Sequence, residues 1–293
     1  MSEPRELADE TALVETALVE DRVRRGRGPQ DRPALGRVPV ALVVPSLLAL
    51  LLLLLPLVGL LLRAPWSTFL ERVREPEILD ALRLSLVTST IATVLCLVLG
   101  VPLAWLLART SFRGSGTVRA LVSVPLVLPP VVGGVALLMA FGRRGVVGQW
   151  LDEAFGITVP FTTAAVVLAQ TFVALPFLVM SVEGSLRTAD PRYDEVAATL
   201  GARRLVTFVR VTLPLAGPGI AAGAALAWAR ALGEFGATIT FAGSVPGVTR
   251  TMPLQIYSAM QSDADTAIML SVILLLISVA VLAGLRGSWA ARA

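Results

Sequence analysis

Six long apolar stretches alternate with shorter polar segments along the chain. The first, residues 39–62, carries no charge over 24 residues; at about 1.5 Å per residue it spans roughly 36 Å, more than the ~30 Å hydrocarbon core of a bilayer. The other five lie at about 84–107, 118–142, 161–182, 215–241 and 266–285. Each must be helical in lipid, where no water satisfies an open backbone. The pattern predicts an all-α integral membrane protein with about six transmembrane helices in a domain of residues 38–293.

Residues 1–37 differ from this pattern, because they hold seven Arg and eight Asp or Glu and no long apolar run. The pentapeptide ETALV occurs twice in tandem there, and a period of five does not keep one face of a helix. The segment is also too long and too acidic for the start of a signal peptide. We expect a polar, disordered cytoplasmic tail, followed by an uncleaved first span.

Prolines interrupt several of the apolar stretches, at Pro125, Pro129, Pro130, Pro176 and Pro218. Proline removes a helical hydrogen bond and kinks the helix, and membranes tolerate such breaks where they face protein or a water-filled cavity. The prolines therefore indicate either ordinary kinks in a packed bundle or a pathway through it, and the sequence leaves both open.

Small residues recur every fourth position in the fifth stretch, at Gly219, Gly223, Ala227 and Ala231. This spacing places them on one helix face, where small side chains allow another backbone to approach closely. The stripe predicts tight helix–helix packing.

The chain holds 25 Arg, no Lys, no His and one cysteine, Cys96. A P-loop ATPase needs Lys, and Ser-His-Asp or Cys-His catalysis and imidazole metal sites need His. One cysteine makes neither a disulfide nor a thiolate cluster, and Cys96 lies in an apolar run that favours a buried position. We therefore expect no catalytic residue, no metal site and no cofactor in this chain, and lipid rather than nucleic acid around it.

Arginine is distributed unevenly between the two sides of the six predicted spans. With a cytoplasmic N-terminus, 17 Arg fall on the cytoplasmic side and eight on the other. The loop at 109–119 alone holds three Arg and no acidic residue. Cytoplasmic loops carry the excess of basic residues in membrane proteins, so both termini are predicted to be cytoplasmic.

The polar segment 187–214, between the fourth and fifth stretches, has the punctuation of a short helix. Asp190 followed by Pro191 forms a good N-cap and first helical position, and Gly201 is suited to end the helix. Pro214 is expected to mark the entry to the next span. The segment predicts a short cytoplasmic helix lying between two spans.

This segment resembles the permease signature of binding-protein-dependent ABC importers, E-A-A-x-x-x-G followed after nine residues by I-x-L-P. The matching positions are Glu195, Val196, Ala197, Gly201, Val211, Leu213 and Pro214, with Val196 in place of Ala and Val211 in place of Ile. The resemblance implies a type I ABC importer permease fold and a coupling helix that docks on a separate ATPase chain. Glu195 would lie at that contact, Ala197 and Ala198 would allow close approach, and Gly201 would supply the turn. The alternative is a surface helix without a partner.

The resemblance covers residues 80–285 and is strongest to the permeases of molybdate importers. The stretches that carry it are LGEFGATITFAGSVPGVTRTMPLQIY at 232–257, PLAWLLAR at 102–109, PLVLPP at 125–130 and ALPFLV at 174–179. Sulfate permeases share Gly-Glu-Phe/Tyr-Gly at 233–236, and tungstate importers look similar. The resemblance implies import of a tetrahedral oxyanion, molybdate before sulfate, thiosulfate or tungstate. It further implies a bacterial cell membrane, a second permease copy, cytoplasmic ATP-binding subunits and an extracytoplasmic molybdate-binding protein.

Two charges fall in the fifth stretch, Arg230 and Glu234. A charge at mid-bilayer costs about 2.5–3.5 kcal/mol, so such residues usually pair and face protein or water. Their four-residue spacing lets them pair with each other. They are candidates for a gate or pathway, together with the hydroxyls of Thr238 and Thr240. Equally, the charges could form a structural ion pair, and the threonines could cap or back-bond the helix end.

Two other classes of protein are less consistent with the sequence. A secondary transporter or channel predicts inverted repeats or several buried ionisable residues, whereas the stretches here are nearly free of charge apart from Arg230 and Glu234. An intramembrane enzyme predicts paired catalytic groups, and the composition offers neither His nor Lys.

Overall fold

A computed structural model of the chain describes residues 40–190 and 192–290. The predicted tail at 1–37 and the helix-starting Pro191 lie outside the described residues. The chain divides into two compact units between Gly59 and Leu60, and each is described by itself. The first unit contains most of helix α2 (Val40–Arg63), an apolar helix of 24 residues that matches the first predicted span.

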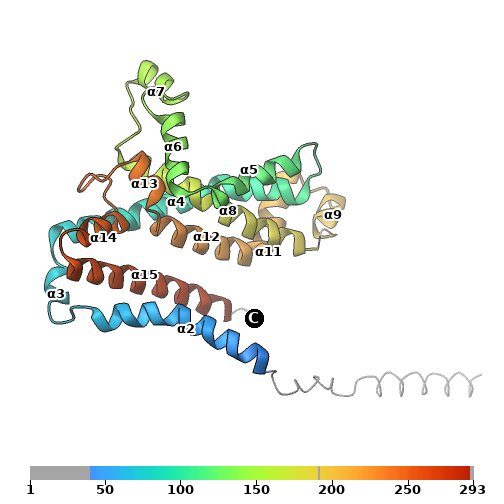
Figure 1. The fold of residues 1–293 in the computed structure, drawn as a ribbon. Helices are drawn as coiled ribbons and strands as arrows, with labels where there is room; N and C mark the ends of the chain where they lie inside the picture. The colour runs from blue at the N-terminus through green and yellow to red at the C-terminus, as the bar shows by residue number, and fades with distance from the viewer. Residues whose placement is uncertain (1–39, 191, 291–293) are drawn as a thin grey trace, which may run out of the picture. The chain divides into compact units, whose positions relative to one another are not determined.

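All regular structure in the described part of the second unit is helical (Figure 1). The elements are α3 (Phe69–Arg72), α4 (Pro76–Arg109), α5 (Ser115–Val127), α6 (Pro130–Phe141), α7 (Gly148–Phe155), α8 (Thr163–Thr188), α9 (Arg192–Thr199), α10 (Arg204–Thr207), the π-helical turn η1 (Phe208–Thr212), α11 (Leu213–Leu215), α12 (Gly217–Leu232), α13 (Gly236–Phe241), α14 (Met252–Met260) and α15 (Ala264–Ala290). The all-α prediction is confirmed.

Among the described residues, four helices are long and apolar enough to cross a membrane alone, namely α2, α4, α8 and α15. Two further candidates are bent pairs. Helices α5 and α6 meet at 118°, and the 204–215 segment meets α12 at 73°. Counted as one span each, the pairs bring the number to the predicted six. The predicted stretches 118–142 and 215–241 are each interrupted: α5 ends at Val127 and α6 begins at Pro130, and α12 ends at Leu232 and α13 begins at Gly236.

Two consecutive prolines explain the sharp break between α5 and α6. A residue that precedes proline is driven away from the helical region by the proline ring. Leu128 precedes Pro129, which precedes Pro130, and both Leu128 and Pro129 are extended, with ψ of 132° and 134°. Pro130 then occupies the first turn of α6, where its missing N–H costs nothing.

The second bend lies at Ala216, just before α12. Ala216 has ψ of −3°, and Pro218 in the first turn of α12 has no N–H to continue the preceding helix. Pro214 lies inside α11, so the span α12 begins three residues later than the expected entry at Pro214. Pro214 does not begin α12 because it already lies in the first turn of α11, where a helix accommodates proline.

The core of the second unit is formed by α4, α8 and α12. A Cβ atom added at Gly219 would collide with Ser185 of α8, and one at Gly223 would lie 3.0 Å from Cβ of Ser181. The hydroxyl of Ser181 donates to the carbonyl of Gly219 at 3.0 Å, and Ala227 is fully buried. The small-residue stripe therefore packs α12 directly on α8, as predicted (Figure 1).

Two smaller apolar clusters flank this core. One joins α6 and α13 to the first half of α8. The other joins α14 and α15 to the start of α4. Cys96 is fully buried in the central cluster, in line with its apolar surroundings in the sequence. Together, the three apolar clusters pack α4, α6, α8, α12, α13, α14 and α15 into one unit, which is called the framework below.

We predict that Gly219→Ala destabilises the folded chain in detergent by about 1–3 kcal/mol, because the added methyl overpacks the contact with Ser185. Gly217→Ala is the matched control, since a methyl group added at Gly217 would have no atom within 4 Å. Thermal unfolding of both variants checks the prediction, and equal midpoints would contradict it.

Candidate functional site

Helix α9 is bounded by the caps that its sequence predicts. The carboxylate of Asp190 accepts the N–H of Arg192 at 2.9 Å. At the other end Gly201 has φ of +80°, its N–H donates to the carbonyl of Ala198, and the N–H of Ala202 donates to that of Ala197. These nested bonds form a Schellman motif, in which glycine adopts the left-handed conformation without steric cost. The predicted turn at Gly201 is thus present.

Asp194 ties α9 to two other elements. One carboxylate oxygen accepts the hydroxyl of Thr212 at 2.8 Å, and the other lies 3.3 Å from Nε of Arg109, the last residue of α4. Arg109 also donates to the carbonyl of Ala189 at 3.3 Å. The helix is therefore attached to the end of α4 and to η1, which leads to α12. Sequence reasoning missed this connection; its only signals are an acid in the first turn of α9 and a base in the last turn of α4.

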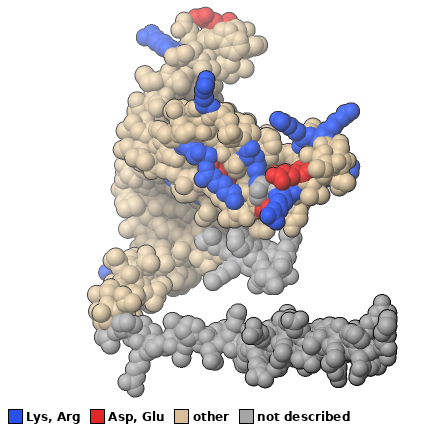
Figure 2. Space-filling view, turned by 90° about the vertical axis from the view of Figure 1, so that its right-hand side faces the viewer, with Lys and Arg blue, Asp and Glu red and all other residues tan. Residues whose placement is uncertain are grey.

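A second ion cluster stiffens the same end of the framework. Glu183 of α8 is 9% exposed, accepts a hydrogen bond from Arg119 at 2.7 Å and forms an ion pair with Arg187 at 2.8 Å. Arg119 also donates to the carbonyl of Leu107 at 2.6 Å. These contacts join helices α4, α5 and α8 to one another. Figure 2 looks onto this end and shows Arg side chains gathered around the few acidic ones.

The two sides of α9 present different surfaces. Tyr193, Val196 and Leu200 are exposed at 56%, 57% and 83%, and they line an apolar groove of about 510 Å³ with the buried Ala197. The predicted Glu195 and Ala198 instead line a cavity of about 560 Å³. Its other walls include Trp105, Arg109, Asp194, Arg204 and Phe208.

The remaining two residues of the predicted coupling set lie apart from α9. Leu213 and Pro214 both belong to α11, where Leu213 packs on the central cluster and Pro214 is exposed. The structure therefore brings Glu195, Ala197, Ala198 and Gly201 together but not the pair in α11.

Arg230 and Glu234 form the predicted ion pair, with Nη1 and Oε2 separated by 2.5 Å. Glu234 is 1% exposed and lies between α12 and α13, where its other oxygen accepts the N–H of Ala237 at 2.8 Å. Thr240 donates back to the carbonyl of Gly236, so its hydroxyl takes the back-bonding role. The Oγ1 of Thr238 is buried and has no hydrogen-bond partner among the described residues.

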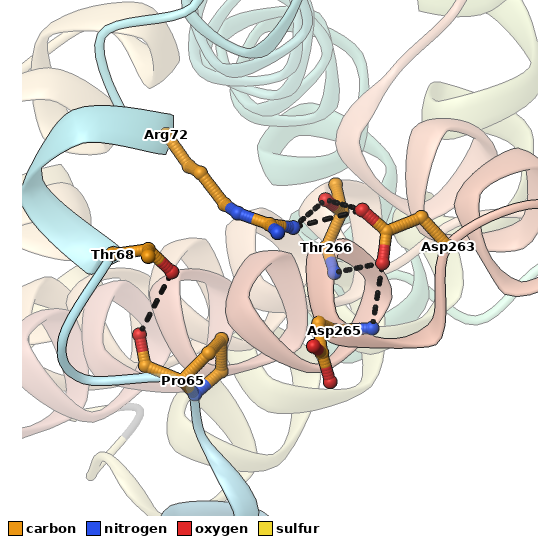
Figure 3. Close-up of polar contacts among 6 residues, drawn as sticks. All are labelled: Pro65, Thr68, Arg72, Asp263, Asp265 and Thr266. Atoms are coloured by element: carbon orange, nitrogen blue, oxygen red, sulfur yellow. Dashed lines mark hydrogen bonds and ion pairs between the residues drawn. The ribbon is translucent and has the colours of Figure 1, made fainter.

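A third polar cluster lies at the start of α15 (Figure 3). Asp263 accepts the backbone N–H groups of Asp265 and Thr266, the hydroxyl of Thr266 and Nη1 of Arg72. Hydrogen bonds from the side chain and backbone of Thr266, followed by the charge of Arg72, hold the pKa of Asp263 below its ordinary value. The cluster fastens the segment before α4 to the start of α15.

A family model described as "Binding-protein-dependent transport system inner membrane component" matches residues 100–287. The molybdenum transport system permease protein ModB of Mycobacterium tuberculosis is 51% identical over 247 residues, covering 84% of this chain and 93% of that protein. The protein of the same name from Escherichia coli is 41% identical, with 73% and 93% covered. The sulfate transport system permease protein CysT of Escherichia coli is 36% identical, with 72% and 77% covered.

Solved structures show the same fold. The bacterial alginate ABC transporter with its periplasmic protein aligns with a TM-score of 0.68 at 17% identity, covering 84% of this chain and 91% of the matched chain. The inward-facing methionine ABC transporter MetNI aligns with a TM-score of 0.56 at 20% identity, covering 73% and 94%. These similarities concern the arrangement of helices alone.

We predict that Asp194→Asn loosens α9, because the variant loses an ion pair and weakens a hydrogen bond, together worth about 1 kcal/mol at this half-exposed position. Amide hydrogen exchange at 192–199 should accelerate about fivefold. Asp152→Asn, which removes the exposed pair with Arg143, is the control and should leave that exchange unchanged. Unaltered exchange in the Asp194 variant would refute the tether.

Proposed function

The chain belongs to the family of binding-protein-dependent transport system inner membrane components, and on that premise we propose that it imports molybdate. It is the membrane-spanning permease subunit of an ABC importer, and ATP hydrolysis belongs to a separate subunit. The observation that carries the substrate proposal is the 51% identity to a molybdenum permease over 84% of the chain. Sulfate is the second candidate, because a sulfate permease is 36% identical.

Helix α9 is proposed as the coupling helix that docks on the ATPase. Its exposed stripe of Tyr193, Val196 and Leu200 suits burial against a protein partner, since isolated surface helices rarely expose such a run. The small side chains of Ala197 and Ala198 would allow the partner to approach the helix closely, and Glu195 would add a polar contact. Gly201 allows the chain to turn away from the partner. Leu213 then anchors the following segment at the framework, and Pro214 stays exposed beside it.

Force applied to α9 has two direct routes into the membrane helices. One runs through Asp194 and Arg109 into α4, and the other through Asp194 and Thr212 into η1 and the α11–α12 elbow. ATP binding would draw two such helices together and open the pathway outward, and hydrolysis would reset it. Contacts that differ between the two states are what a two-state transporter requires.

The proposed assembly has two copies of this chain, two ATPases and an extracytoplasmic molybdate-binding protein. We propose that both termini, including the tail at 1–37, are cytoplasmic, and the excess of Arg beside α9 and at 109–119 supports this orientation. The cluster around Arg72 and Asp263 lies at the opposite end of α4 from α9, so it would face the binding protein.

We predict that the reconstituted complex hydrolyses ATP faster with molybdate-loaded than with sulfate-loaded binding protein. The expected ratio is about tenfold, because one well-placed recognition contact discriminates by that factor. Steady-state ATPase rates in proteoliposomes provide the measurement. Equal or reversed stimulation would transfer the assignment to sulfate and leave the importer fold untouched.

We also predict that Gly201→Val abolishes ATP-coupled uptake while insertion into the membrane continues. Valine at a φ of +80° costs about 1–2 kcal/mol and distorts the end of α9. Gly156→Val is a matched control, because Gly156 ends α7 with φ of +65° and, as at Gly201, a methyl group added there would have no atom within 4 Å. Normal uptake in the Gly201 variant would argue against coupling through α9.

A further inference from the structure

The break between α5 and α6 lies beside the break between α12 and α13. A Cβ atom added at Gly236, the first residue of α13, would lie 2.6 Å from Cβ of Pro130, the first residue of α6. One added at Gly134 would lie 2.7 Å from Cβ of Thr240 and 2.8 Å from the carbonyl oxygen of Ala237. Non-helical backbone at membrane depth is tolerated where it is buried in protein or lines a water-filled cavity. The meeting of two such breaks therefore defines a junction, formed by 128–130 and 233–236.

Arg230 stands in the last turn of α12, immediately before this junction. Its side chain is 29% exposed, whereas Glu234 is 1% exposed. Both carboxylate oxygens of Glu234 are occupied, one by Nη1 of Arg230 and the other by the N–H of Ala237. No other acceptor for Arg230 occurs among the described residues. The arginine is thus fixed through one nitrogen, and the remaining N–H donors of its guanidinium are left free.

The surroundings of the junction favour an anion over a cation. Glu234 is the only acidic residue in 115–141 and in 204–243, and it is fully engaged. Pro130, Val131 and Val132, at the start of α6, are exposed and uncharged. Nearby in α13, the buried hydroxyl of Thr238 has no hydrogen-bond partner among the described residues. Buried polar groups are normally satisfied, so an unsatisfied one next to a helix break is consistent with water or solute at this place.

We propose that the free edge of the Arg230 guanidinium is a transit contact for the tetrahedral oxyanion inside the permease, with Glu234 as its positioning residue. The planar fork of arginine can donate to two oxygens of one oxyanion. The carboxylate of Glu234 holds the fork at the junction and offsets part of its charge, which keeps the anion weakly held, as conduction requires. The proposal rests on oxyanion import as the function of the chain.

The test compares Arg230→Gln, Glu234→Gln and the double variant Arg230→Gln/Glu234→Gln in the complete complex, reconstituted with its binding protein. Each single change leaves one charge unpaired, so a loss of folding would be expected from a structural pair as well. The double variant removes both charges and keeps the side-chain sizes close. A purely structural pair predicts recovery of both stability and transport in the double variant.

The transit contact predicts a different result. The double variant should assemble and keep ATPase stimulation by loaded binding protein, yet its kcat/KM for uptake should fall about tenfold, the cost of one charge-assisted hydrogen bond. Arg230→Lys should retain part of the uptake because the positive charge remains. Arg143→Gln/Asp152→Asn, at an exposed pair far along the chain, is the control and should transport normally.

Uptake is measured with molybdate, tungstate and sulfate, and each variant is compared with wild type for whichever oxyanion wild type carries. Wild-type uptake of sulfate alone would overturn the molybdate proposal and leave the role of Arg230 standing. Wild-type uptake by the double variant would overturn the role of Arg230 and leave the proposed function standing. A wild-type complex that imports none of the three oxyanions would overturn both.

Discussion

Inside a bilayer an open backbone N–H or C=O finds no water, and this constraint decides where the chain leaves the helical conformation. At the first break, two consecutive prolines bring no N–H groups that would need a partner. At the break between α12 and α13, the carboxylate of Glu234 accepts the N–H of Ala237 and replaces a missing helical acceptor. The same carboxylate neutralises Arg230, so a single side chain satisfies both the backbone and the charge at this break.

The end of the framework near α9 is held by ion pairs and hydrogen bonds between side chains, because charged residues are abundant there. Glu183 joins α8 to Arg119 of α5 and pairs with Arg187 one turn along α8, and Asp194 joins α9 to Arg109 and Thr212. Buried or half-buried charges of this kind require partners, and each partner here comes from a different element or turn. The result is a cross-linked platform that exposes the apolar stripe of α9. The partner proposed for this stripe would act on the membrane helices through these contacts.

Local patterns in the sequence were sufficient to predict much of this arrangement. Hydrophobic runs located the spans, the caps at Asp190 and Gly201 bounded α9, and the stripe from Gly219 to Ala231 identified the packed face of α12. The i,i+4 pairing of Arg230 with Glu234 was equally local. These features depend on residues a few positions apart, whose geometry is set by the helix itself.

The features that could not be predicted are of two kinds. Some depend on residues far apart in the sequence, and others depend on whether a proline bends or breaks the helix that contains it. All of helices α5 to α8 lie between Arg109 and Asp194 along the chain, and no periodicity connects the two residues. A proline inside an apolar run can bend a span slightly or break it, and the choice at Pro129 depends on the second proline behind it. The junction of α6 with α13 required both breaks to be located first.

The π-helical turn between Phe208 and Thr212 gives the elbow before α12 a property that a plain helix lacks. Such a turn contains one residue more than the hydrogen-bonding register of an α-helix needs. Sliding that extra residue along the segment would rotate the residues that it passes by about 100°, the angle of one residue in an α-helix. Because Asp194 holds Thr212 at the end of this turn, the displacement of α9 that we propose would reach the adjoining α11 as a rotation about the helix axis.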